Sequence, residues 1–281
     1  MNARIVIKLG GSALGDAATL GELVKTVRGY RRRGYHVAVV HGGGPAINEA
    51  LKARGIAWTF INGQRQTTPE MIEVIDEVLS KQVNGRVVEA LRAGGIPATG
   101  LSGADGILNC VQANAELMQV GLVESVDTSA IENAWAAGFA NDETGRTYDA
   151  PVPVIAPVGV GARGEKYNVN ADWAATKIAA ALQAERLLFL TDQKGILDRN
   201  KKPLRSATPE VIHQMIQDGD ISGGMCTKVL AMMSALNHGV EQVRVLHAAH
   251  ASKVLTAVKA GTLLVFDTAT RTKGVLHEHA S

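Results

Sequence analysis

Apolar residues follow two alternating patterns along this chain. Short aliphatic runs have the length and β-branched content of buried strands, and each is followed by a longer segment whose apolar residues recur every three or four positions, as in residues 20–27. Strands are expected at residues 5–9, 37–40, 96–101, 107–111, 152–156, 187–190, 243–246 and 263–266, and helices around residues 20–27, 47–51, 68–93, 128–137, 171–182, 208–215, 229–236 and 254–258. This alternation predicts an α/β fold with an open, mainly parallel central sheet sandwiched by helices.

The pattern contains no linker rich in Pro, Ser or Gly that would separate two independent domains. Two lobes, residues 1–170 and residues 171–281, would therefore share one continuous sheet. Residues 141–149 are polar and lack periodicity, so a surface loop or hairpin is expected there. The last dozen residues are expected to form a frayed tail.

Composition and charge narrow the classes of partner. Apolar residues make up 46% of the chain but aromatic residues only 4%, so the core must be aliphatic. The 29 basic and 27 acidic residues leave a formal charge of +2, which gives no general field for nucleic acid or an anionic membrane. No apolar stretch approaches the ~20 residues of a membrane span, and no signal peptide is recognisable, so a cytoplasmic protein is expected. Cys110 and Cys226 lack the spacing of metal ligands and are interpreted as ordinary thiols.

The first segment with chemical potential follows the first predicted strand. It reads Lys8-Leu9-Gly10-Gly11-Ser12 and leads into a helix. Glycines at such a junction let the backbone approach a ligand closely, and free N–H groups at a helix start can bind an anion. A tight turn with an exposed lysine is an equally good interpretation of this segment alone.

A second glycine loop follows the second predicted strand and again opens a helix. It reads His41-Gly42-Gly43-Gly44-Pro45. Loops at the carboxyl ends of parallel strands lie at one edge of a sheet, where ligand sites of α/β proteins form. The spacing matches neither the P-loop nor the dinucleotide fingerprint, yet three consecutive glycines favour a functional loop over a purely structural one. His41 itself is expected only to cap or hydrogen-bond the turn.

Three further segments complete a recognisable series: Asn62-Gly63-Gln64-Arg65, Tyr167-Asn168-Val169-Asn170-Ala171-Asp172 and Gly224-Met225-Cys226-Thr227-Lys228. In this order the five segments resemble the amino-acid kinase superfamily, and within it most closely the N-acetylglutamate kinases. The resemblance runs from about residue 4 to about residue 266. It implies an enzyme that uses ATP to phosphorylate the γ-carboxylate of N-acetyl-L-glutamate, giving N-acetylglutamyl phosphate, in arginine biosynthesis.

The resemblance also implies roles for three charged residues. Lys8 and Lys228 would flank the transferring phosphoryl group, and Asp172 would orient both lysines. Phosphoryl transfer needs preorganised cations and N–H donors around the developing charge. Because a carboxylate nucleophile is already ionised at pH 7, no general base is required.

Binding roles carried over from the resemblance fall into two groups, one in each lobe. The amino-acid substrate would be held in the first lobe and the nucleotide largely in the second, with Mg²⁺ carried by the ATP phosphates and no protein metal ligands. The implied substrate-binding residues are Gly43, Gly44, Arg65, Asn168 and Asn170, and the implied nucleotide-binding residues are Gly10, Gly11, Thr191, Asp192, Lys194, Gly195, Gly224 and Met225. For Asp192 a turn cap is an alternative role.

Two departures from the family pattern keep other functions open. Gln64 and Gln66 stand where apolar residues commonly flank the arginine, and the 141–149 loop is longer than usual. A kinase for an aminoadipate derivative and a non-catalytic ligand sensor on the same fold therefore remain alternatives. Aspartate kinase and uridylate kinase are less favoured, the first because no regulatory domain follows the last predicted strand.

Because the first strand begins at once, without the additional helix of arginine-regulated members, we expect an enzyme that arginine does not inhibit, and a homodimer.

Overall fold

The largest sheet combines strands from both halves of the chain. A computed structural model describes residues 3–137, 150–257 and 260–266. The strands of this sheet are β1 (Arg4–Leu9), β2 (His36–His41), β5 (Ala98–Ser102), β8 (Val152–Ala156), β11 (Arg186–Thr191), β12 (Ser206–Ala207), β13 (Gln242–His247) and β14 (Thr262–Leu264). Their order is β12-β14-β13-β11-β1-β2-β8-β5, and all neighbours are parallel except β13 and β14. The predicted mainly parallel α/β fold is confirmed.

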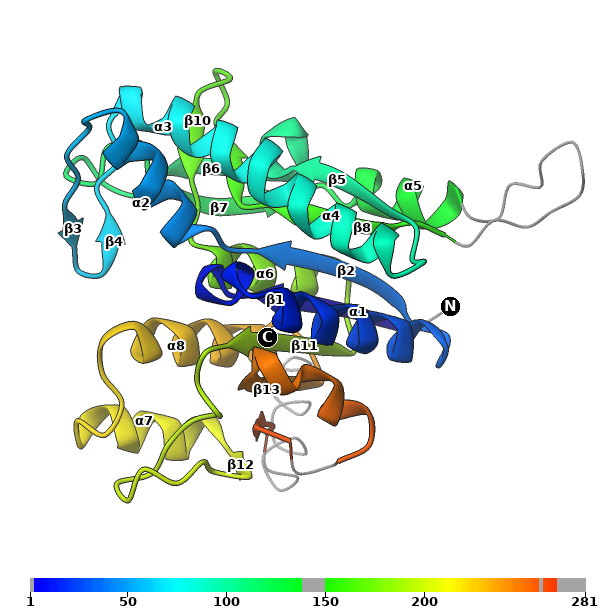
Figure 1. Cartoon of the computed structure of the whole chain (residues 1–281). Helices are drawn as coiled ribbons and strands as arrows, with labels where there is room; N and C mark the ends of the chain where they lie inside the picture. The colour runs from blue at the N-terminus through cyan, green and yellow to red at the C-terminus, as the bar shows by residue number, and fades with distance from the viewer. Residues whose placement is uncertain (1–2, 138–149, 258–259, 267–281) are drawn as a thin grey trace, which may run out of the picture.

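Helices cover both faces of this sheet (Figure 1). The α-helices are α1 (Ala17–Arg31), α2 (Gly44–Ala53), α3 (Pro69–Asp76), α4 (Asn84–Ala93), α5 (Ser129–Ala136), α6 (Ala171–Ala181), α7 (Pro209–Gln217) and α8 (Gly223–Asn237), and shorter 3₁₀ or π segments are η1 (Gly11–Gly15), η2 (Glu77–Val83), η3 (Gly103–Ile107) and η5 (Ala248–Leu255). Side chains alternate along β1: Ile5, Ile7 and Leu9 pack in one core with α1 to α4, whereas Val6 packs in a second core with α6 and α8.

The central contact between the two halves is the pairing of β1 with β11, which places Lys8 beside Phe189. In Figure 1 the elements of the first 170 residues occupy the upper part, and α7, α8, β12 and β13 the lower part. The assignment of separate binding tasks to residues 1–170 and 171–281 stays a prediction.

Two smaller sheets were not predicted from the sequence. A four-stranded sheet has the order β10-β9-β6-β7, and β3 pairs with β4 in a hairpin. These strands are β3 (Phe60–Ile61), β4 (Gln64–Arg65), β6 (Leu108–Gln112), β7 (Gly121–Val126), β9 (Val158–Val160) and β10 (Lys166–Asn168). Except for β6 they are too short, or too exposed on one face, to stand out as apolar runs.

Two helix predictions need correction. The helix expected over residues 68–93 is present, but a π segment, η2, interrupts it before Asn84. The helix expected around residues 254–258 is instead the 3₁₀ segment η5. Its fully buried residues include Ala248 and Ala251, whose small side chains give a weak periodic signal. The predicted loop at 141–149 and the C-terminal tail lie outside the described residues.

Candidate active site

Both glycine loops lie at the carboxyl ends of adjacent parallel strands. The N–H of Gly10 donates to Leu190 O at 2.8 Å, and the N–H of Gly42 donates to Leu9 O at 2.8 Å. A Cβ placed on Gly11 would lie 2.7 Å from the backbone nitrogen of Gly43, which is closer than any side chain tolerates. The loops therefore pack backbone against backbone, and glycine is required where they meet.

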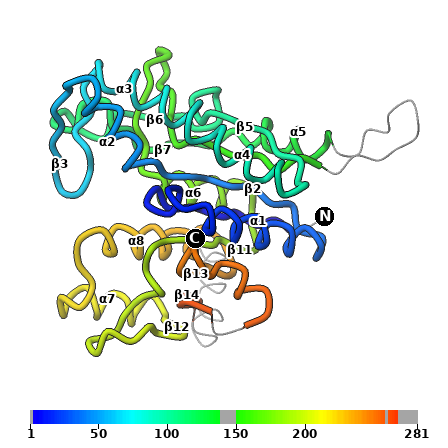
Figure 2. The backbone as a smooth tube through the Cα atoms, viewed as in Figure 1, coloured from blue at the N-terminus to red at the C-terminus, as the bar shows by residue number. Residues whose placement is uncertain are grey.

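This contact places the start of one helix against the other loop. Gly43 is the N-cap residue of α2, Gly44 is its first residue, and Pro45 follows. The first N–H groups of a helix have no carbonyl partner within the helix and attract anions. Figure 2 shows the loop after β1, in blue, between α2 and α8. The junction of the two loops has the chemistry of an oxyanion or phosphate site.

Three charged side chains meet beside this junction. The carboxylate of Asp172 forms an ion pair with each of two lysines: Oδ1 lies 2.8 Å from Lys8 Nζ, and Oδ2 lies 2.8 Å from Lys228 Nζ. The exposed fractions are only 6% for Lys8, 8% for Asp172 and 9% for Lys228. The structure thus brings together two ammonium groups that are far apart in sequence, with one carboxylate between them.

Local structure explains how each member of this triad is placed. The alternation along β1 directs Lys8 to the face covered by α6 and α8. Asp172 lies in the first turn of α6, whose N-cap residue is Asn170; the Asn170 side-chain oxygen accepts the N–H of Asp172 at 2.9 Å. Lys228 projects from α8, with Nζ 5.7 Å from the ring centre of Phe189 on β11.

Burial and mutual charge shape the protonation of the triad. Burial alone would raise the pKa of Asp172, but the ammonium groups of Lys8 and Lys228 outweigh it and lower this pKa to about 2. Burial, with repulsion from Lys8, lowers the pKa of Lys228, and the Asp172 carboxylate opposes that change only in part. At neutral pH Asp172 is therefore ionised and holds two cations that would otherwise repel each other.

A pocket of about 530 Å³ opens from the triad toward α8. Its lining contains most of the residues predicted to contact the nucleotide, together with residues that the sequence did not single out. The lining comprises Lys8, Gly10, Gly11, Ser12, Thr191, Asp192, Gln193, Leu197, Asp198, Lys201, Asp220, Ile221, Ser222, Gly224, Met225 and Lys228.

Lys194 and Gly195 are the two predicted nucleotide-binding residues outside this lining. Lys194 is exposed, and Gly195 is buried against β14, where the next residue, Ile196, donates its N–H to Thr262 Oγ1 at 2.9 Å. Gly195 thus serves the packing of the loop after β11. The structure gives no pocket contact to support the prediction for either residue.

The rim of the pocket was missed by sequence reasoning. Arg199 forms ion pairs with Asp218 and with Asp220, the latter at 2.7 Å, and so ties the loop after β11 to the segment between α7 and α8. Asp198 and Lys201 line the pocket from the same loop. These residues lie in polar, aperiodic segments, so only the folded chain shows that they meet.

The predicted substrate arginine is buried beyond the second loop. Arg65 is 7% exposed, its Nη2 donates to Asn48 Oδ1 on α2, and its guanidinium lies 4.8 Å from the ring centre of Phe60 and 5.5 Å from that of Trp58. Burial lowers its pKa, yet a guanidinium stays charged at neutral pH. Arg65 Nη1 is buried with no hydrogen-bond partner among the described residues. An unsatisfied, buried N–H donor of this kind suits a carboxylate ligand.

Asn168 is connected to Arg65 through one threonine. Its Nδ2 donates to Thr67 Oγ1 at 3.1 Å, and that hydroxyl donates to Arg65 O at 2.9 Å. The amide of Asn168 and the guanidinium of Arg65 therefore belong to one local network. Asn170 uses its oxygen to cap α6, so its predicted substrate contact stays a prediction.

Two further observations concern ligands and membranes. Within residues 3–137, 150–257 and 260–266, no group of three or more His, Cys, Asp or Glu side chains has the arrangement of a metal site. Among those same residues, no helix is both long enough and apolar enough to cross a bilayer.

Cys110 is buried, and burial raises the pKa of its thiol to about 12, so it is an inert core residue.

Comparisons with known proteins agree on one family. Residues 3–247 match the model of the amino acid kinase family. An acetylglutamate kinase of Jannaschia sp. (strain CCS1) is 41% identical over 240 residues, which are 85% of this chain and 80% of that protein. An acetylglutamate kinase of Geobacter sulfurreducens is 42% identical over 267 residues, which are 92% of this chain and 90% of that protein.

Solved structures share the fold. The protein smu.665 from Streptococcus mutans UA159 superimposes with a TM-score of 0.79 at 26% identity, covering 95% of this chain and 100% of that one. Carbamate kinase from Giardia lamblia superimposes with a TM-score of 0.65 at 16% identity, covering 95% and 99%. The second likeness concerns the fold alone.

Proposed function

Because the chain belongs to the amino acid kinase family, we propose that it transfers the γ-phosphoryl group of ATP to the γ-carboxylate of N-acetyl-L-glutamate, giving N-acetylglutamyl phosphate and ADP. One observation carries the proposal. Lys8 and Lys228 meet at Asp172 beside the two glycine loops, in a chain about 40% identical to proteins named acetylglutamate kinase.

The proposed mechanism requires no proton transfer by the protein. The substrate carboxylate attacks the γ-phosphorus in line with the departing ADP oxygen; the new O–P bond forms as the old one breaks. Negative charge is spread over the equatorial and bridging oxygens, and two ammonium groups and backbone N–H groups nearby stabilise it. Lys8, Lys228 and the amides of the two glycine loops are the groups in this chain that fill these roles.

Asp172 contributes by holding both cations ready before the nucleotide arrives. With its pKa at about 2, its charge is constant over the pH range in which an enzyme works. Each ammonium group has three N–H donors, and each lies 2.8 Å from one Asp172 oxygen, so donors are left for phosphate oxygens.

For the acceptor substrate, the proposal assigns Arg65 to a carboxylate and Asn168 to the amide of the acetyl group. The buried Nη1 donor of Arg65 supports the first assignment. The backbone N–H groups of Gly43 and Gly44 are assigned to contacts with the substrate or with the transferring phosphoryl group. Asn170 is assigned to the substrate-binding site. One turn along α2 from Gly44, Asn48 binds Arg65, so these groups share one side of that helix.

The nucleotide is assigned to the 530 Å³ pocket. Gly10, Gly11, Gly224 and the uncapped N-terminus of α8 would receive the phosphates, whereas Thr191, Asp192 and Met225 would lie along the nucleoside. Lys194 and Gly195 follow Thr191 and Asp192 in sequence but do not line the pocket, so no nucleotide contact is assigned to them. Mg²⁺, held by the ATP phosphates and water, would neutralise charge on the β- and γ-oxygens.

The sequence-based alternative, an aminoadipate derivative as substrate, rests on Gln64 and Gln66. Gln66 donates its side-chain N–H to the backbone oxygen of Glu116 at 2.8 Å. The Gln66 amide therefore bonds to the protein itself, which removes one reason to prefer a different substrate.

We also propose a cytoplasmic homodimer, active in arginine biosynthesis and not inhibited by arginine. Submillimolar inhibition in an arginine titration would contradict the proposed lack of inhibition.

Turnover with a panel of acceptors tests the proposal. ADP release is measured with N-acetyl-L-glutamate, an acylated aminoadipate, aspartate and UMP. We expect the highest kcat/KM with N-acetyl-L-glutamate. A higher value with the aminoadipate derivative would change the substrate but keep the chemistry, whereas ATP binding without turnover of any acceptor would favour a ligand sensor.

A further inference from the structure

His41 has a more specific environment than a residue that merely ends a strand. It is the last residue of β2, it is 0% exposed, and its Nδ1 lies 2.9 Å from the carbonyl oxygen of Gly42. A carbonyl oxygen can only accept, so Nδ1 must carry the proton. Burial, opposed by this hydrogen bond and aided by the charge of Lys8, lowers the pKa of His41 to about 4, so the ring is neutral at physiological pH.

Asn84 completes the hydrogen bonding of this ring. In the neutral tautomer Nε2 is an acceptor, and Asn84 Nδ2 lies 3.3 Å from it. The same amide nitrogen donates to Val154 O on β8 at 2.8 Å and lies 3.4 Å from Leu101 O on β5, so its second proton is shared between the ring and β5. Asn84 is 3% exposed, and this buried pair fixes the rotation of the imidazole.

The fold makes specific room for Asn84. It follows the π segment η2, which shifts the register of the long helix just before this residue. A Cβ on Gly100 would lie 2.2 Å from Asn84 Oδ1, so the amide occupies the space that a side chain on β5 would fill. An apolar side chain at position 84 would be the simpler way to fill a core, and a buried polar network therefore calls for another reason.

That reason follows from the geometry of the peptide unit. In a trans peptide the C=O of one residue and the N–H of the next point in opposite directions and cannot rotate independently. Holding Gly42 O on the imidazole therefore fixes the direction of the Gly43 N–H. The Gly43 nitrogen is the atom that a Cβ on Gly11 would approach to 2.7 Å, so it lies at the junction of the two loops.

We propose that His41 and Asn84 are positioning residues, which hold the Gly42–Gly43 peptide so that the Gly43 N–H is aimed at the transferring phosphoryl group. This inference rests on the proposed function, because it takes the loop junction as the phosphoryl site. Neither side chain is among the residues that line the 530 Å³ pocket. Together the two side chains restrict the flexible three-glycine loop, so that its Gly43 N–H is held in one direction before the substrates bind.

Two substitutions of the histidine separate positioning from packing. The amide nitrogen of asparagine is bonded to Cγ, as Nδ1 is in histidine, so His41→Asn keeps a donor for Gly42 O. In glutamine the amide lies one bond further out, near Nε2, so His41→Gln loses that donor and keeps a partner for Asn84. Thr26→Val is the control, because Thr26 is equally buried on α1 and donates to Glu22 O at 2.7 Å, far from the loops.

We expect His41→Gln to lower kcat by about 10- to 100-fold, a part of the effect of losing one oxyanion donor, and to leave KM for ATP within about threefold of the wild type. His41→Asn should recover most of that kcat. Binding of ADP with aluminium fluoride and N-acetyl-L-glutamate, a mimic of the phosphoryl group in flight, should weaken in parallel with kcat. Thr26→Val should lower the melting temperature without changing kcat.

Equal losses of kcat in His41→Gln and His41→Asn would overturn the inference, as would a normal kcat in folded His41→Gln. If His41→Gln does not fold, Asn84→Ala takes its place and is expected to lower kcat about 10-fold with KM for ATP unchanged; an unchanged kcat there would equally overturn it. Failure of the proposed function would show differently, as absent turnover by the wild-type chain.

Discussion

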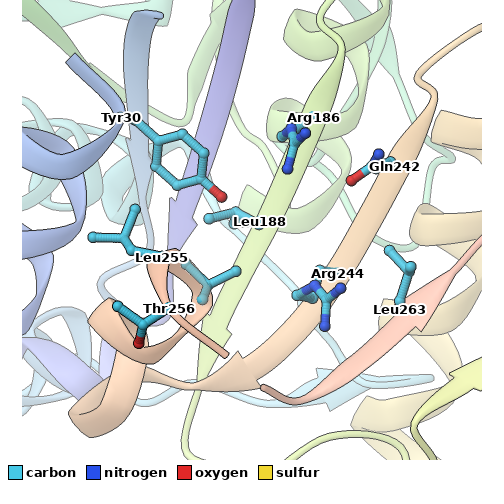
Figure 3. Close-up of a pocket in the computed structure, with 9 residues that line it drawn as sticks. Tyr30, Arg186, Leu188, Gln242, Arg244, Leu255, Thr256 and Leu263 are labelled. Carbon is cyan, nitrogen blue, oxygen red and sulfur yellow. The ribbon is translucent and has the colours of Figure 1, made fainter. Parts of the chain in front are cut away.

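Two of the pockets formed by the described residues bring cationic side chains together at opposite ends and on opposite faces of the large sheet. The candidate active site lies at the carboxyl ends of β1 and β11, on the face of α6 and α8. The other pocket, about 310 Å³, lies near the amino ends of β11 and β13, on the face of α1 and η5. Figure 3 shows Arg186 and Arg244 on these two strands, with the hydroxyl of Tyr30 nearby.

The cation pairs Lys8–Lys228 and Arg186–Arg244 differ in their hydrogen-bond and ion-pair partners. In the second pocket each guanidinium is tied to the fold: Arg244 Nη1 donates to Ala260 O at 2.7 Å, and Arg186 Nε donates to Glu185 Oε1 at 2.9 Å. In the candidate active site the Asp172 carboxylate is the ion-pair partner of both ammonium groups. The two guanidinium groups thus bond to segments that pack around them, whereas Lys8 and Lys228 converge on one carboxylate and line the 530 Å³ pocket. Substitutions in the first pocket should therefore change turnover, and those in the second should change stability.

Removal of a lysine tests this comparison with the largest effect. We expect Lys8→Met and Lys228→Met each to lower kcat by about 10³-fold, since each removes one preorganised cation from the phosphoryl group. The remaining lysine still pairs with Asp172, so the melting temperature should change little. Steady-state kinetics and thermal unfolding on the same preparations provide the measurement. A variant that keeps more than a tenth of wild-type kcat would remove that lysine from the mechanism.

The contact between the glycine loops gives the next largest effect. Gly11→Ala would place a methyl group 2.7 Å from the Gly43 nitrogen and should lower kcat by about 10²-fold by moving the donors at the junction. Gly15→Ala is the matched control, because a Cβ there meets no atom within 4 Å. The prediction fails if the two alanine variants have the same kcat.

Acid titration distinguishes the Asp172 carboxylate of the candidate active site from the arginines, which do not titrate. The folded pKa of Asp172, about 2, is below its usual 3.8, so its contribution is present above pH 3.8 and is lost as the pH falls toward 2. The shift corresponds to about 2 kcal/mol of unfolding free energy. Denaturant unfolding of the wild type and Asp172→Asn at pH 6 and pH 2 should show their difference shrinking by about that amount. A difference independent of pH would contradict the ion-paired state of Asp172.

Arg65 combines features of both pockets, since it is anchored by Asn48 and has a buried Nη1 without a partner among the described residues. We expect Arg65→Lys to raise KM for N-acetyl-L-glutamate about 10-fold, because an ammonium group cannot form the planar fork to a carboxylate. KM for ATP should stay within about twofold. Equal changes in both constants would indicate a distorted fold and not a lost substrate contact.

Sequence reasoning predicted those parts of the site that have a local signature. The predicted strand ends at Leu9 and Val40, each followed by a glycine-rich loop, were enough to place both loops at one edge of the sheet. The family resemblance supplied Asp172 and Lys228 as partners of Lys8, and the structure brings the three together.

Features that depend on long-range packing left no such signature. Asn84 is one of several polar residues in a helical pattern, and only the fold brings it to His41. The rim residues Asp198 and Asp220 come from aperiodic segments joined through Arg199. Conversely, Gly195 was predicted from its place in a motif, but it is buried against β14 and outside the pocket. Local pattern determines where a strand ends, whereas packing of distant segments determines what its last residues contact.

The smallest expected effect on turnover comes from the arginine pocket and completes the comparison. Arg244→Met removes a cation as Lys8→Met does, but it leaves Ala260 O without this donor at 2.7 Å. Loss of a hydrogen bond from a charged group costs about 1.5–3 kcal/mol of unfolding free energy, so the melting temperature should fall while kcat stays within about twofold. Arg186→Met, at a more exposed position, should cost less. If Arg244→Met instead lowers kcat at unchanged stability, the second pocket is coupled to the first through β11 and β13, and the division between the two ends of the sheet is wrong.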